Sequence, residues 1–239
     1  MNKERISIFH PQGLGDAIIC NGFCRYYANN DSTEKVYVYV RKRYIDIVRW
    51  MYRDNLKIVP IPVSVPHSEA YSYCSNIAKT LRSKVIFVGN TPVNKYNDIH
   101  KKYKKFDEII YELGKVPYDH RFKSFYIQRE LDIEKQVAEK LGAFGSYAFV
   151  HDDPEKGFIL NPKTSIKQIR NDKSINPFHL CSILENAEEI HLMESSIKNL
   201  CEQLMLKSKK LFRYDKVRQQ SGYTGWKISK ERYTWQRIF

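Results

Sequence analysis

The sequence predicts an α/β protein built from two parallel-sheet domains of similar size. Strand-like and helix-like segments alternate through the first half, and a second, shorter alternation follows a stretch without a clear period. Such alternation is typical of parallel strands covered by helices on both faces. The length of 239 residues suits two small domains, although length alone also allows a single core.

The first half contains four expected strands separated by helices. Apolar runs predict the strands at 6–9, 35–40, 56–61 and 84–88, and helical spacing predicts the helices at 16–28, 44–52 and 69–81. The prolines after residue 59 are expected to end the third strand. A lysine-rich helical pattern covers 97–114, and 119–129 has no clear period. We therefore expect a first domain over residues 1–129.

The second half repeats the pattern on a smaller scale. The expected strands are 147–150, 158–160, 189–193 and 210–214, and the expected helices are 130–141, 176–185 and 195–206. This gives a second domain over 130–220. The remaining segment, 221–239, carries Tyr223, Trp226, Tyr233, Trp235 and Phe239. So many aromatic side chains predict that this basic tail packs back on the body of the protein.

Composition indicates a globular protein of a reducing compartment. No apolar stretch approaches the roughly 20 residues that span a bilayer, and the charged start is not followed by a signal-peptide core. We expect a cytoplasmic location, with the inner face of the membrane as an alternative. The five cysteines are scattered. Cys20 and Cys24 share one helical face, where two core thiols are a commoner explanation than a metal or disulfide.

The formal charge of +13 is unevenly distributed. Residues 1–130 carry +9, residues 131–206 carry −4, and residues 207–239 carry +8. A basic first half and tail could attract nucleic acid, an anionic membrane surface or a phosphorylated acceptor. The alternative is a compositional bias toward Lys, Asn, Ile and Tyr, with the lysines simply solvated.

The first candidate site is the loop His10-Pro11-Gln12-Gly13-Leu14-Gly15-Asp16, between the first strand and helix. Its glycines could adopt positive φ and permit close approach of another group. The helix start would attract a phosphate. Asp16 is either a capping residue or a carboxylate able to take a proton from a hydroxyl. A third glycine is missing, so this is no full dinucleotide fingerprint.

Two further loops belong to the second domain. One of them is the segment 191–196, in which a strand leads directly into a helix. The hydroxyls of Ser195 and Ser196 and the free amides of the helix start, next to His191 and Glu194, could hold a diphosphate. A simple serine N-cap is the alternative. The loop from His151 to Gly157 contains two adjacent aspartates and Lys156. Adjacent side chains on an extended segment point to opposite sides, so we expect a turn here and no metal site.

Together these motifs resemble the ADP-heptose:lipopolysaccharide heptosyltransferase group and related glycosyltransferases of the GT-B fold. The Gly-Leu-Gly-Asp loop is similar to the N-terminal signature of that group, and residues 191–204 are similar to its donor-binding element. Residues 150–154 and 121–126 are similar to segments of uncharacterised bacterial and viral relatives. The resemblance implies two Rossmann-like domains facing a central cleft.

The resemblance also implies roles for individual residues. Asp16 would be the general base, in an acceptor-side loop with Gly13, Leu14 and Gly15. The donor nucleotide and its diphosphate would contact the second-domain residues His151, Lys156, His191, Glu194, Ser195 and Ser196. Such enzymes need no metal or other cofactor, because positive groups and helix dipoles stabilise the departing diphosphate. The partners would be a nucleotide-sugar donor and a glycan or lipid-linked acceptor, with nucleic acid not expected.

Four basic residues are candidates for phosphate or acceptor contacts on charge and position alone: Arg121, Lys123, Arg129 and Arg218. A surface salt bridge is the alternative for each. The chain is shorter than typical members of the group and lacks their glycine-rich motif before the C-terminal helix, so the donor sugar stays open. Two rival functions also stay open. One is a nucleic-acid-binding protein that uses the basic tail and the stretch 101–105, with Tyr103 and Phe106 as stacking surfaces. The other is a degenerate transferase fold that serves as an interaction module.

Overall fold

The structure of the protein is a computed structural model that describes residues 3–10, 12–89, 105–215 and 230–238, except for the side chain of Lys156. Two compact units are present. The first contains the described residues up to Gln128 and also Lys230, and the second contains those from Arg129 to Asp215 and from Glu231 to Ile238. Each unit is built on an all-parallel sheet. The predicted α/β class with two parallel sheets is therefore confirmed.

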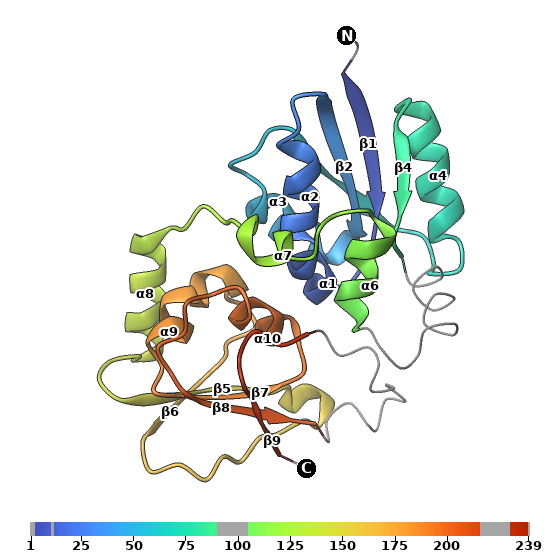
Figure 1. The fold of residues 1–239 in the computed structure, drawn as a ribbon. Helices are drawn as coiled ribbons and strands as arrows, with labels where there is room; N and C mark the ends of the chain where they lie inside the picture. Colours follow the sequence, from blue (N-terminus) through green and yellow to red (C-terminus); the bar gives the residue numbers. More distant parts are fainter. Residues whose placement is uncertain (1–2, 11, 90–104, 216–229, 239) are drawn as a thin grey trace. The chain divides into compact units, whose positions relative to one another are not determined.

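The sheet of the first unit has four strands in the order β3-β2-β1-β4 (Figure 1). They are β1 (Glu4–Phe9), β2 (Thr33–Arg41), β3 (Ile58–Val63) and β4 (Lys84–Phe87). The helices are α1 (Leu14–Ile19), α2 (Asn21–Ala28), η1 (Lys42–Tyr44), α3 (Ile45–Met51), α4 (Ala70–Thr80), α6 (Phe106–Leu113) and α7 (His120–Lys123). The expected helix over 97–114 is described only from residue 105 onward, where α6 lies.

Helices cover both faces of this sheet. On one face Phe9, Tyr39 and Val63 pack against Ala70 and Cys74 of α4. Neighbouring strand positions point to the opposite face, where Ile6, Ile8, Val36 and Val38 are buried and α2 contacts β2. Because the strands are parallel, their carboxyl ends lie at one edge of the sheet, where ligands of such sheets bind. The loop after β1 lies at this edge.

Two local expectations in the first unit were wrong. Pro60 and Pro62 do not end the third strand but lie inside β3, paired with Val38 and Val40 of β2. Proline has no backbone N–H to donate to a neighbouring strand. It is tolerated in β3 because β3 is an edge strand with a neighbour on one side only. The predicted helix 16–28 is divided at Cys20 into α1 and α2. Cys20 and Cys24 are both fully buried, as expected for core thiols, and burial raises the pKa of Cys24 to about 12.

The sheet of the second unit has five parallel strands in the order β6-β5-β7-β8-β9. They are β5 (Tyr147–His151), β6 (Lys167–Arg170), β7 (Glu189–Met193), β8 (Lys210–Tyr214) and β9 (Gln236–Ile238). The helices are α8 (Leu131–Leu141), η2 (Pro154–Lys156), η3 (Pro177–Leu180), α9 (Cys181–Asn186) and α10 (Ser196–Cys201). The expected helices 176–185 and 195–206 correspond to η3 with α9 and to a shorter α10.

The second sheet differs from the expectation in two strands. Residues 158–160 form no strand, since Phe158 makes only an isolated antiparallel bridge to Asp153, and the strand beside β5 is β6. The other difference is β9, which pairs in parallel with β8 and comes from the aromatic tail. The described end of the tail thus packs on the second unit. Its residues 221–229 and Phe239 lie outside the described residues.

Candidate active site

Asp16 lies at the carboxyl edge of the first sheet, in the first turn of α1. Its Oδ2 accepts a hydrogen bond from the backbone N–H of Gly13, at 3.1 Å, and its side chain is half-buried. This contact closes the N-terminus of α1, so the capping alternative describes a real interaction. A carboxylate can accept several hydrogen bonds, and capping is therefore compatible with a second role as a base.

Gly13 is needed for a different reason from the one expected. Its backbone is extended, with φ −74° and ψ 155°, and Gly15 lies within α1. Neither is among the described residues with positive φ, so that expectation was wrong. A Cβ at Gly13 would lie only 2.6 Å from Asp16 Oδ2. The absence of a side chain thus makes room for the Asp16 carboxylate.

Gln12 is a residue of this loop that the sequence did not single out. Its side chain is only 7% exposed, and among the described residues neither Oε1 nor Nε2 has a hydrogen-bond partner. Buried carboxamides are normally paired, because burying unpaired polar atoms is costly. Gln12 therefore offers a donor and an acceptor next to the Asp16 loop. Nothing in the local sequence signals this burial.

The loop after β7 begins α10 in a similar way but with different groups. Ser195 is the N-cap, and its Oγ accepts a hydrogen bond from the N–H of Lys198, at 3.4 Å. Ser196 is the first residue of the helix and is half-buried. Glu194 Oε2 is buried without a hydrogen-bond partner in the described part of the chain. The loop thus contains the expected hydroxyls, of which one is already used as a cap.

His191 lies inside β7 and is fixed by its neighbours. Its ring stacks on Phe212 at 4.5 Å, Nδ1 is 3.1 Å from the Tyr214 hydroxyl, and Nε2 is 3.2 Å from Glu189 Oε2. The side chain is 2% exposed, and burial lowers its pKa. These contacts engage both ring nitrogens, so the geometry favours a structural role over a diphosphate contact.

The loop after β5 holds its aspartates in ion pairs. Asp152 pairs with Arg170, and Asp153 pairs with Lys173. His151 precedes them, and burial lowers its pKa to about 4. It is thus neutral near pH 7, and its Nδ1 has no hydrogen-bond partner among the described residues. His151 can therefore offer a neutral hydrogen bond but no positive charge to a diphosphate. The side chain of Lys156 lies outside the described part.

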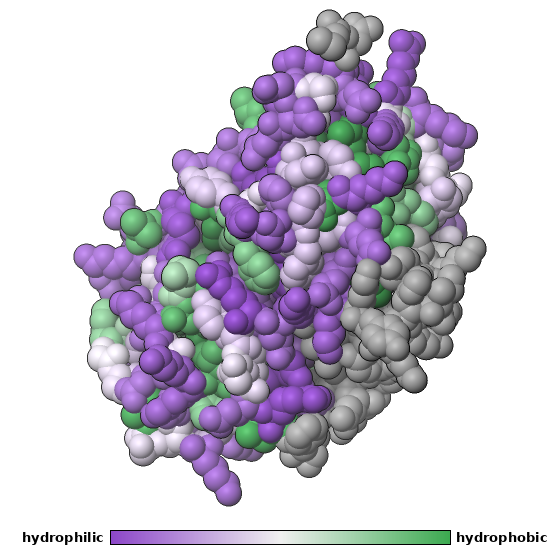
Figure 2. All heavy atoms as spheres, in the orientation of Figure 1, coloured by the Kyte–Doolittle hydropathy of each residue, from purple (hydrophilic) through white to green (hydrophobic). Residues whose placement is uncertain are grey.

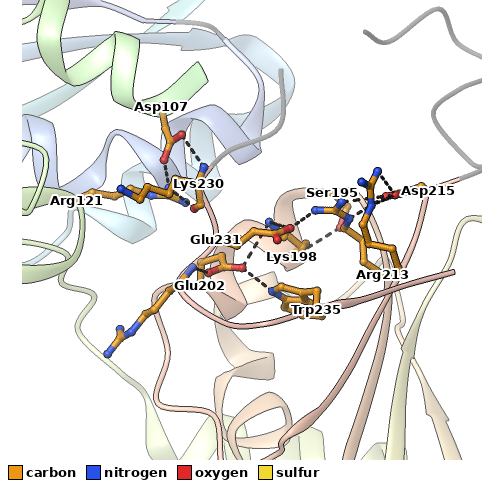
Figure 3. Close-up of polar contacts among 12 residues, drawn as sticks. Asp107, Arg121, Ser195, Lys198, Glu202, Arg213, Asp215, Lys230, Glu231 and Trp235 are labelled. Atoms are coloured by element: carbon orange, nitrogen blue, oxygen red, sulfur yellow. Dashed lines mark hydrogen bonds and ion pairs between the residues drawn. The ribbon is translucent and has the colours of Figure 1, made fainter. Parts of the chain in front are cut away.

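A buried charge cluster, formed by Lys198, Glu202, Arg213, Glu231 and Trp235, lies in the second unit beside α10 (Figure 3). Lys198 Nζ is 3.4 Å from Glu202 Oε1 and 3.3 Å from Glu231 Oε1. Trp235 Nε1 donates to Glu202 Oε1 at 2.7 Å, and Arg213 pairs with Glu231. The tail thereby contacts α10, the helix whose N-cap is Ser195. The sequence indicated packing of the tail but not these ion pairs.

Three of the four basic candidates are held in ion pairs. Arg121 is 0% exposed in the first unit, where it pairs with Asp107 and donates to the Lys230 carbonyl at 2.8 Å. Lys123 pairs with Asp119 at 2.5 Å on the surface. Arg129 binds Glu134, Glu185 and Ser182 in the second unit. These contacts favour the surface salt-bridge alternative for Lys123. Arg129 forms a partly buried ion pair and Arg121 a fully buried one. Arg218 lies outside the described residues.

The fold, with two parallel sheets and a strand-to-helix loop at the carboxyl edge of each, has a match among solved structures. A solved glycosyl transferase family 9 structure shares this fold. It comes from Veillonella parvula DSM 2008, and the similarity has a TM-score of 0.61 at 10% sequence identity, covering 100% of this chain and 87% of that chain. No family model matches the sequence, and no curated protein matches it. At this identity the likeness establishes the fold, which agrees with the GT-B-like architecture expected from the sequence.

The described residues lack two features that would bear on function. They contain no helix long and apolar enough to cross a membrane. They also contain no group of three or more His, Cys, Asp or Glu side chains placed to hold a metal ion. Chemistry without a metal remains an expectation that follows from the resemblance.

Proposed function

We propose that the protein is a glycosyltransferase that moves a sugar from a nucleotide-activated donor to an acceptor hydroxyl. The observation that carries the proposal is the fold shared along the whole chain with a glycosyl transferase family 9 protein. The Asp16 carboxylate at the carboxyl edge of the first sheet supports it, because ligands of open α/β sheets bind at that edge. The acceptor in this proposal is a glycan or a lipid-linked sugar.

In the proposed reaction Asp16 takes the proton of the acceptor hydroxyl. The acceptor oxygen attacks the anomeric carbon, a new C–O bond forms, and the bond to the nucleotide diphosphate breaks, so the diphosphate leaves with the electron pair. The carboxamide of Gln12, buried without a partner among the described residues, would hold the acceptor by hydrogen bonds. The loop containing Glu194, Ser195 and Ser196 would bind the donor nucleotide, with hydroxyl and amide donors on the diphosphate.

The start of α1, in the glycine loop, was one candidate site for a phosphate. The Asp16 carboxylate already occupies the start of α1, and a second negative group there would be repelled. The loop is therefore proposed to serve the acceptor, and the donor phosphates are proposed to bind in the second unit.

The proposal is tested by adding nucleotide sugars one at a time and measuring thermal stability. A ligand present at about 100 times its Kd should stabilise the protein by about 2.7 kcal/mol. Stabilisation by one nucleotide class, followed by release of that nucleoside diphosphate when acceptor glycans are added, would support transfer. No response to any nucleotide sugar, together with salt-sensitive binding of oligonucleotides, would instead favour the nucleic-acid-binding alternative.

A further inference from the structure

A basic hollow lies at the amino-terminal edge of the first sheet, the edge opposite the Asp16 loop. It is open to solvent, has a volume of about 520 Å³, and is lined by Lys3, Glu4, Arg5, Glu34, Arg82 and Lys84. Lys3 and Arg5 come from the start of β1, and Lys84 begins β4, which pairs with β1 in parallel. Figure 1 shows the starts of these two strands side by side. The sheet thus gathers cations from distant parts of the sequence.

The hollow carries an excess of positive charge. Four of its side chains are cationic and two are carboxylates. One cation is neutralised, because Arg5 pairs with Glu34 at 2.9 Å. Among the described residues, Lys3, Arg82 and Lys84 form no ion pair, although Lys3 interacts electrostatically with Glu34. Like charges that line one hollow repel one another. Because the four cations outnumber the two carboxylates, Glu4 and Glu34, by two, the hollow indicates a place for a multiply charged anion.

Arg82 holds an unusual backbone conformation at the rim. It has φ +50°, in the left-handed region that favours glycine. It follows α4, where the N–H of Arg82 binds the Lys79 carbonyl at 3.0 Å and the N–H of Ser83 binds the Ala78 carbonyl at 3.0 Å. These two bonds form a Schellman motif, whose left-handed position is usually glycine. An arginine there keeps a guanidinium at the hollow at the expense of backbone stability.

We propose that this hollow binds a dianionic phosphoryl group. A guanidinium matches two phosphoryl oxygens in a bidentate manner, while the ammonium groups of Lys3 and Lys84 neutralise the remaining charge. A single carboxylate would leave cations of the hollow unbalanced, so a phosphoryl group is the better fit. The site lies at the other edge of the sheet from Asp16 and is independent of the transferase proposal. The ligand is either a free phosphate compound or the headgroup of an anionic lipid.

The chain offers a matched control for the test. Lys115 also has positive φ, at +55°, and it follows α6 with the same pair of bonds, Lys115 N–H to Glu112 and Val116 N–H to Tyr111. Like Arg82 it is exposed. Arg82→Gly and Lys115→Gly therefore remove one cation each, from the same backbone motif, but only the first alters the hollow. Both should keep or raise Tm, since glycine relieves the left-handed strain.

Inorganic phosphate is the first probe, titrated into the full chain and both variants by calorimetry at low ionic strength. The wild type and Lys115→Gly should bind alike, and Arg82→Gly should lose at least about tenfold in affinity, as expected for one charge-assisted pair. Equal weakening in both variants, or no saturable binding by the wild type, would overturn the proposal.

The second probe distinguishes the two sources of the phosphoryl group. Vesicles of phosphatidylcholine with and without phosphatidic acid are mixed with the same three proteins, and bound protein is measured by flotation. A lipid headgroup is identified if the protein floats only with vesicles that contain phosphatidic acid, and if Arg82→Gly reduces this binding while Lys115→Gly does not. Phosphate binding without such retention identifies a free phosphate compound. Retention that is equal in all three proteins, with no effect of Arg82→Gly on phosphate affinity, would contradict the proposed site.

Discussion

The loop after β1 and the loop after β7 both lie at the carboxyl edge of their sheets, but the helices that follow them begin with different groups. Each leads from a buried parallel strand into a short helix at the carboxyl edge. In the first loop the helix start is closed by a carboxylate, that of Asp16, on the N–H of Gly13. In the second it is closed by a neutral hydroxyl, that of Ser195, on the N–H of Lys198.

This difference indicates what each loop can bind. A carboxylate in the first turn of a helix uses the positive end of the helix dipole and repels a second anion. The first turn of α10 contains no acidic residue, and the carboxylate of that loop, Glu194, precedes the Ser195 cap. A diphosphate is therefore better placed beside Ser195 and Ser196, and a hydroxyl that must lose a proton is better placed beside Asp16. Similar strand-to-helix geometry thus supports two different roles.

The most direct way to break this comparison is the substitution Asp16→Asn. The amide oxygen of asparagine can still accept the Gly13 N–H, so Tm should change little. Asparagine cannot take a proton, and turnover should fall by about 10² to 10⁴-fold. Release of nucleoside diphosphate, measured with the donor found by the stability screen, checks this. Asp119→Asn, at the exposed pair with Lys123, is the control and should keep full turnover. Normal turnover of Asp16→Asn would mean that Asp16 is only a cap.

The second prediction concerns His151, which ends β5 at the same edge as the loop after β7. Burial lowers its pKa to about 4, compared with about 6.5 in the unfolded chain. The unfolded state thus binds more protons between these values, so the free energy of unfolding falls as pH decreases from about 6.5 to about 4. The shift corresponds to about 3 kcal/mol.

Urea unfolding at several pH values measures this loss. His151→Gln should show a flatter dependence between pH 6.5 and pH 4, whereas His67→Gln, at an exposed position, should keep the slope of the wild type. A wild-type slope in His151→Gln would show that other groups cause the acid sensitivity. The loop after β5 would then not need a neutral side chain at this position.

The sequence predicted the two loops because their pattern is local. An apolar run followed by Gly-Leu-Gly-Asp or by Glu-Ser-Ser specifies a strand end and a helix start without help from distant residues. Among the described strands, β6 and β9 were not expected as strands, and the other seven overlap expected strands. β9 lies in the tail, which was expected only to pack on the body. Proline at positions 60 and 62 misled the prediction, because edge position is a property of the sheet.

Features that depend on distant partners could not be predicted. The burial of Gln12 and the pairing of Lys198 with Glu202 and Glu231 depend on packing of the whole unit. Arg121 was a candidate for a phosphate or acceptor contact, with a surface salt bridge as the alternative, but it forms a fully buried ion pair with Asp107. Charge and position along the chain carry no information about such partners.

A third prediction sharpens the role of the glycine in the first loop. A Cβ at position 13 would lie 2.6 Å from Asp16 Oδ2, so Gly13→Ala should displace the carboxylate. We expect a loss of about 2 kcal/mol in the free energy of unfolding and a reduced turnover. Because the contact is with one side chain, Gly13→Ala should cost much less in an Asp16→Ala background. A double-mutant cycle measured by urea unfolding checks this, and additive costs would contradict the proposed contact.

The smallest effect is expected in the second loop, where it separates capping from binding. Ser195→Ala removes the hydroxyl that accepts the Lys198 N–H and should lower the free energy of unfolding by about 1 kcal/mol. Ser196→Ala leaves this cap intact, so it should change stability by less than about 0.5 kcal/mol while weakening donor affinity several-fold. Urea unfolding and calorimetric titration of the nucleotide sugar measure the two quantities. Unchanged donor affinity in both variants would mean that Ser195 only caps α10 and that this loop does not bind the donor phosphates. The two loops would then differ only in the group that caps the helix, Asp16 in the first and Ser195 in the second.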